Sequence, residues 1–207
     1  MVSRKVVFWE VDTQADFMLP GGKLYVRGAE RLLPNIRRLT DVAREGRVFL
    51  VSHGCYHSAD DPEFKTFPPH CIKGTSGAEF VPEALTDQVL TIPNEPEAQV
   101  PRDLSPHQQI ILEKQTLDIF ESRHAGALVE RLNPDAEFIV FGVVTEYCVG
   151  FAAKGLLKRG RRVSVVQDAI ETLEVEDANR TIAELQNLGA KFITTEQALT
   201  LTRHKKS

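Results

Sequence analysis

The chain has 207 residues, of which 42% are hydrophobic and 26% charged, a composition typical of one compact soluble domain. The formal net charge of −4, without a long basic stripe, gives no support for nucleic-acid binding. No apolar run approaches the ~20 residues of a membrane span, no signal-peptide pattern begins the chain, and 3 scattered cysteines do not suggest a secreted disulfide framework. We therefore expect a cytoplasmic protein with free thiols and no membrane or nucleic-acid partner.

The sequence contains six short apolar runs that are typical of β-strands. They cover residues 5–11, 47–52, 109–114, 137–144, 162–168 and 191–194. Nearly continuous hydrophobicity is expected where both faces of a parallel strand are buried. Amphipathic segments lie between the runs, among them 29–46, with Pro34 in its early turns, and 175–189, and both end on glycine. The alternation predicts an α/β fold with a parallel sheet flanked by helices on both faces.

Two regions interrupt this alternation. Residues 53–82 are rich in His, Asp, Pro and Gly, and residues 91–108 are rich in proline. Long irregular loops inside a compact domain are usually functional when they are ordered. Because ligands of open α/β sheets bind beyond the carboxyl ends of the strands, the loop from residue 53 is the better candidate for a site.

The basic end, residues 203–207, is expected to be a solvated C-terminus.

Reactive side chains follow several predicted strand ends: Asp12, the loop 53–70, Lys114 and Cys148. Cys148 lies in VVTEYCVGFAAKGLLKRG, residues 143–160, where a strand pattern changes into a helical one. A helix N-terminus and a nearby lysine lower the pKa of a thiol, and a carboxylate can accept its proton. Free amides at the same place suit an oxyanion. This convergence predicts a site with a thiol nucleophile.

Each of these residues also has a simpler interpretation. On general grounds, a cysteine such as Cys148 is more often a small buried hydrophobic residue, and a lysine such as Lys114 is more often a solvated charge. Asp12 could equally be a cap of the following turn. Nucleotide binding is not expected. GTSG lacks the spacing and the lysine of a phosphate-binding loop, and no G-x-G-x-x-G follows the first strand.

Segments VDTQADF, FPPHCIKGTSGAE, EKQTLDIF and GVVTEYCV resemble, in order, the four signature blocks of the isochorismatase-like cysteine hydrolases, most closely the nicotinamidase branch. The likeness extends from residue 6 to about residue 199. It implies a single isochorismatase-like domain over 1–207, built on a six-stranded parallel sheet flanked by helices. The strand pattern predicts the same sheet independently.

The resemblance implies a role for each matching residue. Cys148 becomes the nucleophile, Asp12 the general base and Lys114 the third catalytic member. The amides of Val144 and Cys148 would form an oxyanion hole, helped by a cis peptide bond between Val143 and Val144. The implied reaction is hydrolysis of a small carboxamide through a thioester, as in the conversion of nicotinamide to nicotinate and ammonia.

Two aromatic residues occupy places that bind the substrate ring in the nicotinamidase branch. Phe17 ends the first block and Phe67 begins the second, so the resemblance implies that they sandwich the ring. Without the resemblance, either phenylalanine would be interpreted as part of the core.

The metal site is where this chain departs from the family pattern. The family has an Asp-x-His pair and a later histidine, whereas this chain has Cys55 and His57, with His70 intact. Thiolate and imidazole both suit Zn²⁺, so a zinc ion held by these three residues is expected, softer than the family's usual set. His53 is an alternative ligand, and the remaining alternative is that no metal binds and Cys55 is inert.

Competing functions remain open at this stage. A related enzyme could act on another small amide or carbamoyl compound, and a catalytically silent binding protein could keep the same fold. Vinyl-ether hydrolysis is less favoured, since the branch that performs it does not use a nucleophilic cysteine. Subunit pairing is common in the family, so we expect a homo-oligomer that binds a small-molecule amide.

Overall fold

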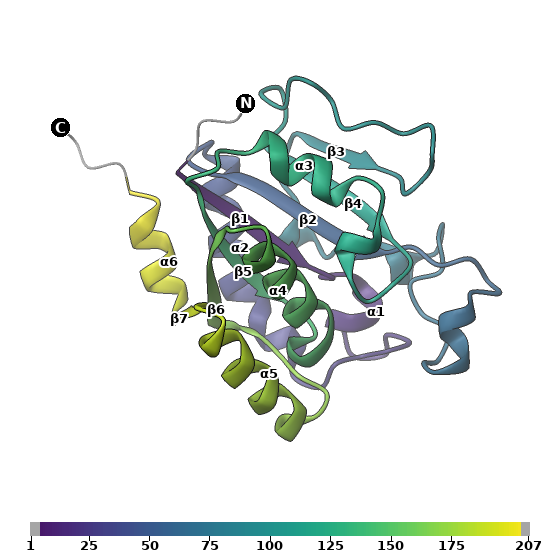
Figure 1. Cartoon of the computed structure of the whole chain (residues 1–207). Coiled ribbons are helices and arrows are strands. Elements are labelled where there is room, and N and C mark those ends of the chain that lie inside the picture. The colour runs from purple at the N-terminus through teal and green to yellow at the C-terminus, as the bar shows by residue number, and fades with distance from the viewer. Residues whose placement is uncertain (1–4, 204–207) are drawn as a thin grey trace.

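The computed structural model describes residues 5–203. Most of the C-terminal tail that we expected to be solvated, residues 204–207, lies outside this range. Its centre is a parallel sheet with the strand order β3-β4-β2-β1-β5-β6-β7 (Figure 1). The strands are β1 Val6–Val11, β2 Phe49–Cys55, β3 Val89–Ile92, β4 Gln109–Lys114, β5 Glu137–Gly142, β6 Arg162–Ile170 and β7 Lys191–Ile193.

The sheet has 7 strands, so the expected number of six is wrong. The additional strand is β3, which pairs in parallel with β4 at the edge of the sheet. It has only 4 residues, two of them exposed, and Pro93 follows it directly. Because β3 is so short and runs directly into a proline-rich stretch, its apolar residues do not stand out from the loop that follows. Its last residues also fall in the stretch predicted to be an irregular, proline-rich loop.

The helices are α1 Ala15–Met18, α2 Leu33–Arg44, α3 Ala125–Arg131, α4 Gly150–Lys158, α5 Val175–Asn187 and α6 Thr195–Leu201. The predicted helix 29–46 divides into a short 3-10 turn, Ala29–Leu32, and α2. Pro34 lies in the first turn of α2, where its missing N–H costs no helical hydrogen bond. Over residues 5–203, none of the helices combines the length and the apolar character needed to cross a bilayer.

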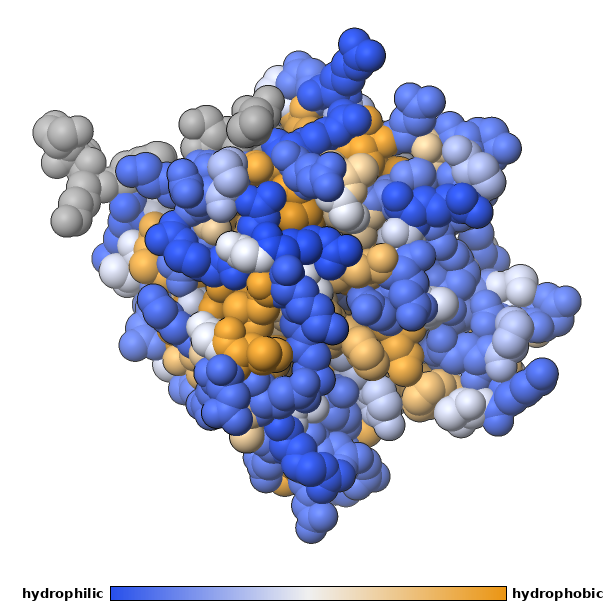
Figure 2. All heavy atoms as spheres, in the orientation of Figure 1, coloured by the Kyte–Doolittle hydropathy of each residue, from blue (hydrophilic) through white to orange (hydrophobic). Residues whose placement is uncertain are grey.

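Helices cover both faces of the sheet, as predicted, and each face has its own apolar core (Figure 1). Trp9 of β1 points into a core shared with α3, α4 and α5. Its neighbour Phe8 points the other way, into a core shared with α1, α2 and α6. Figure 2 shows that the outer surface on the α4 and α5 side is mostly hydrophilic, with apolar areas between the polar side chains.

Four strands, β2, β5, β6 and β7, end at different residues from those predicted, and two of these ends shape the site. β2 continues through His53, Gly54 and Cys55 because its pairing with β4 extends to the pair Cys55 and Lys114. β5 stops at Gly142, whose φ is 119° and where an added Cβ would lie 2.0 Å from the carbonyl oxygen of Val11. Only glycine fits there. The sheet therefore places the ends of β1, β2, β4 and β5 along one edge.

Candidate active site

Asp12 is the first residue beyond β1. Its φ of 49° is in the left-handed region, which Asp tolerates better than most residues other than glycine. The amide of Asp12 donates to the carbonyl of His53 over 2.9 Å, which fixes this turn to the neighbouring strand. The carboxylate then points to Lys114, whose Nζ lies 3.0 Å from Asp12 Oδ2.

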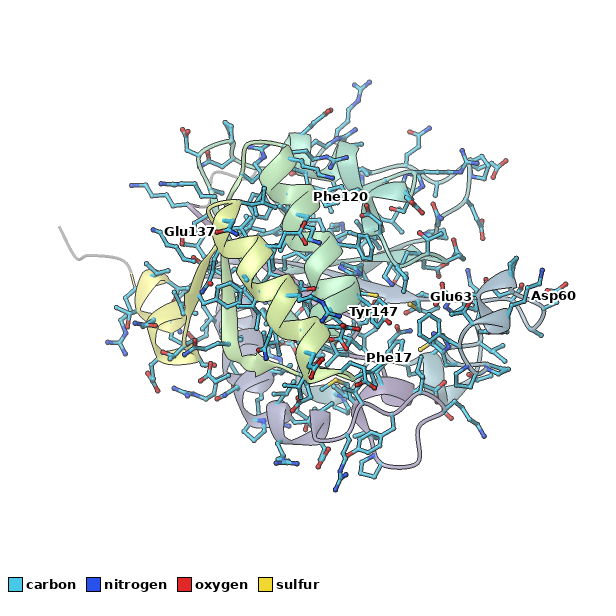
Figure 3. All side chains as sticks on the ribbon, turned by 60° about the horizontal axis from the view of Figure 1, so that its bottom comes forward. Phe17, Asp60, Glu63, Phe120, Glu137 and Tyr147 are labelled. Atoms are coloured by element: carbon cyan, nitrogen blue, oxygen red, sulfur yellow. The ribbon has the colours of Figure 1, made fainter. Side chains whose placement is uncertain are left out.

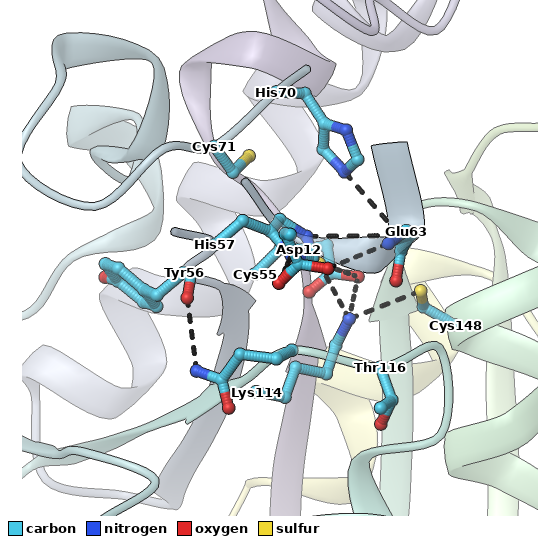
Figure 4. Close-up of polar contacts among 12 residues, drawn as sticks. Asp12, Cys55, Tyr56, His57, Glu63, His70, Cys71, Lys114, Thr116 and Cys148 are labelled. Carbon is cyan, nitrogen blue, oxygen red and sulfur yellow. Dashed lines mark hydrogen bonds and ion pairs between the residues drawn. The ribbon is translucent and has the colours of Figure 1, made fainter. Parts of the chain in front are cut away.

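Cys148 lies in the turn Thr145–Val149, directly before α4. The peptide bond between Val143 and Val144 that precedes this turn is cis, as the resemblance implied. Lys114, the fully buried last residue of β4, donates from Nζ to Cys148 Sγ over 3.4 Å. The structure thus brings Asp12, Lys114 and Cys148 together from three separate strand ends (Figure 4).

Cys55 lies in the same cluster, which the sequence did not indicate. Lys114 Nζ is 2.9 Å from Cys55 Sγ, and that sulfur lies 3.9 Å from Asp12 Oδ2 (Figure 4). The sequence suggested a catalytic group and a separate metal group. In the structure they are one continuous buried cluster, with Cys55 at the junction.

The ammonium group of Lys114 therefore donates hydrogen bonds to the sulfur atoms of two cysteines. Burial alone would lower the pKa of Lys114, but the charges of Asp12 and the two sulfurs raise it well above its usual range, so the lysine stays charged. A hydrogen bond from Cys148 lowers the pKa of Cys55 well below its usual range, and the Lys114 charge lowers it further. The same hydrogen bond, together with burial, raises the pKa of Cys148. Without metal, these shifts favour deprotonation of Cys55 over deprotonation of Cys148, whereas the sequence led us to expect the thiolate at Cys148.

The candidate metal ligands Cys55, His57 and His70 are buried, and their ligand atoms lie within 4.8 Å of one another. In each histidine, Nδ1 lies close to an oxygen atom. His57 Nδ1 is 3.0 Å from Asp61 Oδ2, and His70 Nδ1 is 2.8 Å from the carbonyl oxygen of Pro68. Oxygen atoms in these places favour a proton on Nδ1 and leave Nε2 to bind a metal ion. The donor set and its outer partners therefore fit Zn²⁺.

Glu63 is a further oxygen donor that sequence reasoning missed. Its Oε1 lies 3.9 Å from Nε2 of His57 and 3.9 Å from Nε2 of His70. Glu63 comes from the short 3-10 turn Pro62–Lys65, and its side chain is 14% exposed. The available signal was an acidic residue six positions beyond His57, within the loop already considered functional.

His53 lies outside the group of three. Its Nδ1 is 3.4 Å from Asp12 Oδ1, and its ring packs at 6.1 Å from the ring of Trp9. Burial lowers the pKa of His53, more than Asp12 raises it, so the imidazole is neutral. The alternative ligand therefore lies beside Asp12, apart from the other two histidines.

A pocket opens above the cluster, and both predicted aromatic residues line it. The ring of Phe17 lies 5.2 Å from that of His70, and the ring of Phe67 lies 5.8 Å from that of Tyr147, which the sequence had not singled out. Figure 3 shows Phe17, Glu63 and Tyr147 on the same side of the molecule, away from Glu137 at the start of β5. The pocket is lined by Asp12, Phe17, Leu24, Cys55, Glu63, Phe67, His70, Leu117, Val143, Val144, Tyr147, Cys148 and Leu173.

Two buried polar side chains from the first sequence block hold the walls of the pocket. Gln14 accepts from the amide of Cys55 over 2.7 Å and donates to the carbonyl oxygens of Cys55 and Ala78 over 2.6 and 2.8 Å. Asp16 accepts from the amide of Cys71 over 2.7 Å, which secures the loop after His70. Both residues support the site through the backbone, a role that no sequence pattern revealed.

Comparisons with known proteins were consistent with this geometry. The profile of the isochorismatase domain matches residues 7–92 and 83–197. Pyrococcus horikoshii pyrazinamidase in complex with zinc is 27% identical, covers 92% of this chain and 99% of its own, and has a TM-score of 0.74. Streptococcus mutans pyrazinamidase/nicotinamidase is 25% identical, with coverage of 90% and 99% and a TM-score of 0.71.

A third structure shares the fold at lower identity. Thermoplasma acidophilum N-carbamoylsarcosine amidase is 21% identical, covers 93% of this chain and 97% of its own, and has a TM-score of 0.70. No curated protein matched the chain.

Proposed function

The chain belongs to the isochorismatase family, and we propose that it is a cysteine amidohydrolase that cleaves a small, uncharged carboxamide through a thioester. One observation carries this proposal. Asp12, Lys114 and Cys148 meet at the base of an apolar pocket, with Lys114 Nζ 3.0 Å from the carboxylate and 3.4 Å from the thiol sulfur. A nucleophile, a proton acceptor and a fixed positive charge are the parts that covalent amide hydrolysis needs.

The first half of the reaction forms the thioester. Asp12 accepts the proton of Cys148, and the charge of Lys114 stabilises the resulting thiolate. The sulfur attacks the carboxamide carbon, and the amides of Val144 and Cys148 stabilise the oxyanion. Asp12 then returns the proton to the leaving nitrogen, the C–N bond breaks, and ammonia departs.

The second half releases the acid. Asp12 takes a proton from a water molecule, and the hydroxide attacks the thioester carbon. The C–S bond breaks, Cys148 leaves as a thiolate beside Lys114, and the carboxylic acid product departs. Asp12 carries out every proton transfer in both halves, so the task of Lys114 is to keep the two negative groups close together.

The lining of the pocket supports an uncharged aromatic amide such as nicotinamide. Phe17, Phe67 and Tyr147 supply aromatic surface, and the remaining apolar lining comes from leucine and valine. In the described chain, residues 5–203, the lining includes no arginine or lysine, whereas the carboxylates of Asp12 and Glu63 reach it. A substrate with its own carboxylate, such as N-carbamoylsarcosine, would meet like charge there. The pyrazinamidase and nicotinamidase neighbours are consistent with this preference.

We further propose that Cys55, His57 and His70 hold a divalent metal ion, with zinc preferred. Ligand atoms around tetrahedral zinc lie about 3.5 Å apart at ordinary bond lengths, so small side-chain rotations would close the observed group. When bound, the ion supplies positive charge and a coordination position for a ring nitrogen. The pKa of His57 is raised to about 9, because its hydrogen bond to Cys55 and the nearby carboxylates outweigh burial. Metal binding must therefore displace a proton.

Ammonia release from a panel of small amides tests the proposal. The panel contains nicotinamide, pyrazinamide, benzamide and N-carbamoylsarcosine, and we expect the uncharged ring amides to be cleaved fastest. Cys148→Ala should abolish release, by several orders of magnitude, because a covalent step cannot proceed without the sulfur. Cys71→Ala is the matched control, since Cys71 is buried and contacts the carbonyl of Gly77, outside the pocket.

Unchanged ammonia release by Cys148→Ala would rule out the nucleophile. Tight binding of a ring amide without any release would instead favour the silent binding protein. The expected homo-oligomer is a separate proposal, which light scattering of the purified protein would test.

A further inference from the structure

The sulfur atoms of Cys55 and Cys148 both accept a hydrogen bond from the ammonium group of Lys114. Lys114 Nζ donates to Cys55 Sγ over 2.9 Å and to Cys148 Sγ over 3.4 Å. Two thiols from residues 93 positions apart in the chain are therefore neighbours in a single buried cluster.

Both sulfurs are also reachable from outside. Cys55 and Cys148 line the pocket, although their exposed fractions are only 2% and 6%. A small uncharged oxidant such as a hydroperoxide can enter where a bulky reagent cannot. The fixed charge of Lys114 stabilises a thiolate, which is the form that a peroxide oxidises.

We propose that Cys55 and Cys148 are a redox pair, which a hydroperoxide converts into a reversible intramolecular disulfide. This modification goes beyond amide hydrolysis. It would remove the proposed nucleophile and the proposed first metal ligand in a single event, so the oxidised chain would lose both functions together.

The chemistry balances with hydrogen peroxide as the oxidant. One sulfur attacks a peroxide oxygen, the O–O bond breaks, and the products are a sulfenic acid and water. The second sulfur attacks the sulfenic sulfur, the S–S bond forms, the S–O bond breaks, and a second water leaves with the thiol proton. In total, two thiols lose two protons and two electrons, and one peroxide accepts them and becomes two waters. A dithiol reductant reverses the step by thiol–disulfide exchange.

The pair has a direct chemical test, because trypsin places the 3 cysteines in separate peptides. Cys55 falls in residues 48–65, Cys71 in 66–73 and Cys148 in 132–154. Reduced, chelator-treated protein is exposed to hydrogen peroxide, digested without reductant and analysed by mass spectrometry. We expect a linked species of 48–65 with 132–154. Thiol titration of the denatured chain should fall from three to one and return to three after dithiol treatment.

Two variants sharpen the result. Cys71→Ser should form the same link, since its side chain takes no part in the cluster. Cys55→Ser should form no link and should instead let Cys148 oxidise to sulfinic acid, which dithiols do not reduce. The proposal is overturned if the unmodified chain forms no such link under peroxide, if Cys148 passes to sulfinic acid while Cys55 stays alkylatable, or if the link involves 66–73. None of these readouts requires amide hydrolysis, so failure of the proposed activity is separable.

Discussion

Replacing Glu10 by Gln should change how the stability of the protein depends on pH. Glu10 lies on β1, two residues before Asp12, and is fully buried. Ser52 donates to its Oε2 over 2.6 Å, but no ion pair involving Glu10 was found over residues 5–203. Burial raises the pKa of Glu10 from 4.5 to about 8, and the hydrogen bond from Ser52 offsets only part of this effect.

The sign follows from proton counting. Between pH 4.5 and about 8, folded Glu10 keeps a proton that the unfolded chain has lost, so the free energy of unfolding falls as pH rises. At about 1.4 kcal/mol per pH unit, the full loss across this window is roughly 5 kcal/mol. That is a large part of the stability of an ordinary domain. Glu10→Gln removes the titration, so the variant should gain stability over the wild type as pH rises.

Chemical denaturation between about pH 5 and pH 8 measures this difference. The fluorescence of Trp9, the only tryptophan, is a suitable signal because the residue is fully buried next to Glu10. Glu137→Gln is the matched control. Glu137 also accepts from a serine on a neighbouring strand, over 2.6 Å from Ser164, but it is partly exposed, so its substitution should have a smaller pH-dependent effect. A difference between Glu10→Gln and wild type that stays constant across the range would refute the reasoning.

Three further substitutions test the cluster. Asp12→Asn should lower ammonia release by about 10²–10⁴-fold through loss of the general base, and activity near wild type would exclude that role. Lys114→Met should raise the pH at which the pocket thiols are alkylated, because the ammonium lies 2.9 and 3.4 Å from their sulfurs. An unchanged alkylation profile would contradict the contact. Cys55→Asp should keep a bound metal but shift its preference from Zn²⁺ toward Mn²⁺, since carboxylate is the harder ligand. Elemental analysis after exposure to both ions checks this, and an unaltered ratio would show that Cys55 is no ligand.

The strands differed in how well the sequence predicted them. The strand at 109–114 agrees with β4 residue for residue, because its apolar centre, residues 110–112, marks a strand in which every position is buried. β3 was missed because it is only 4 residues long and runs directly into the proline-rich stretch. The ends of β2 and β5 depend on pairing and on a close approach to Val11, and neither can be read from a local sequence window.

The location of the candidate site could be predicted from the sequence, but the contacts among its side chains could not. Because parallel strands end at one edge, Asp12, Lys114 and Cys148 could be expected near one another from the sequence. That Lys114 also reaches Cys55 depends on the directions of two side chains inside a buried cluster, which spacing does not determine. Glu63 and Gln14 were missed for the same reason, since each acts through a three-dimensional contact with the 55–70 segment.

The contacts of Gln14 have a consequence for how this site can be altered. Both backbone groups of Cys55 are held by the Gln14 amide, so the position of residue 55 does not depend on its own side chain. Another small side chain can therefore occupy this position while the chain keeps its path. In the proposed metal site, a single substitution at residue 55 would therefore change the metal preference without altering the surrounding backbone. For protein engineering, residue 55 is the position at which one type of ligand can be replaced by another. Gln14 and the close-packed Gly54 should not be substituted.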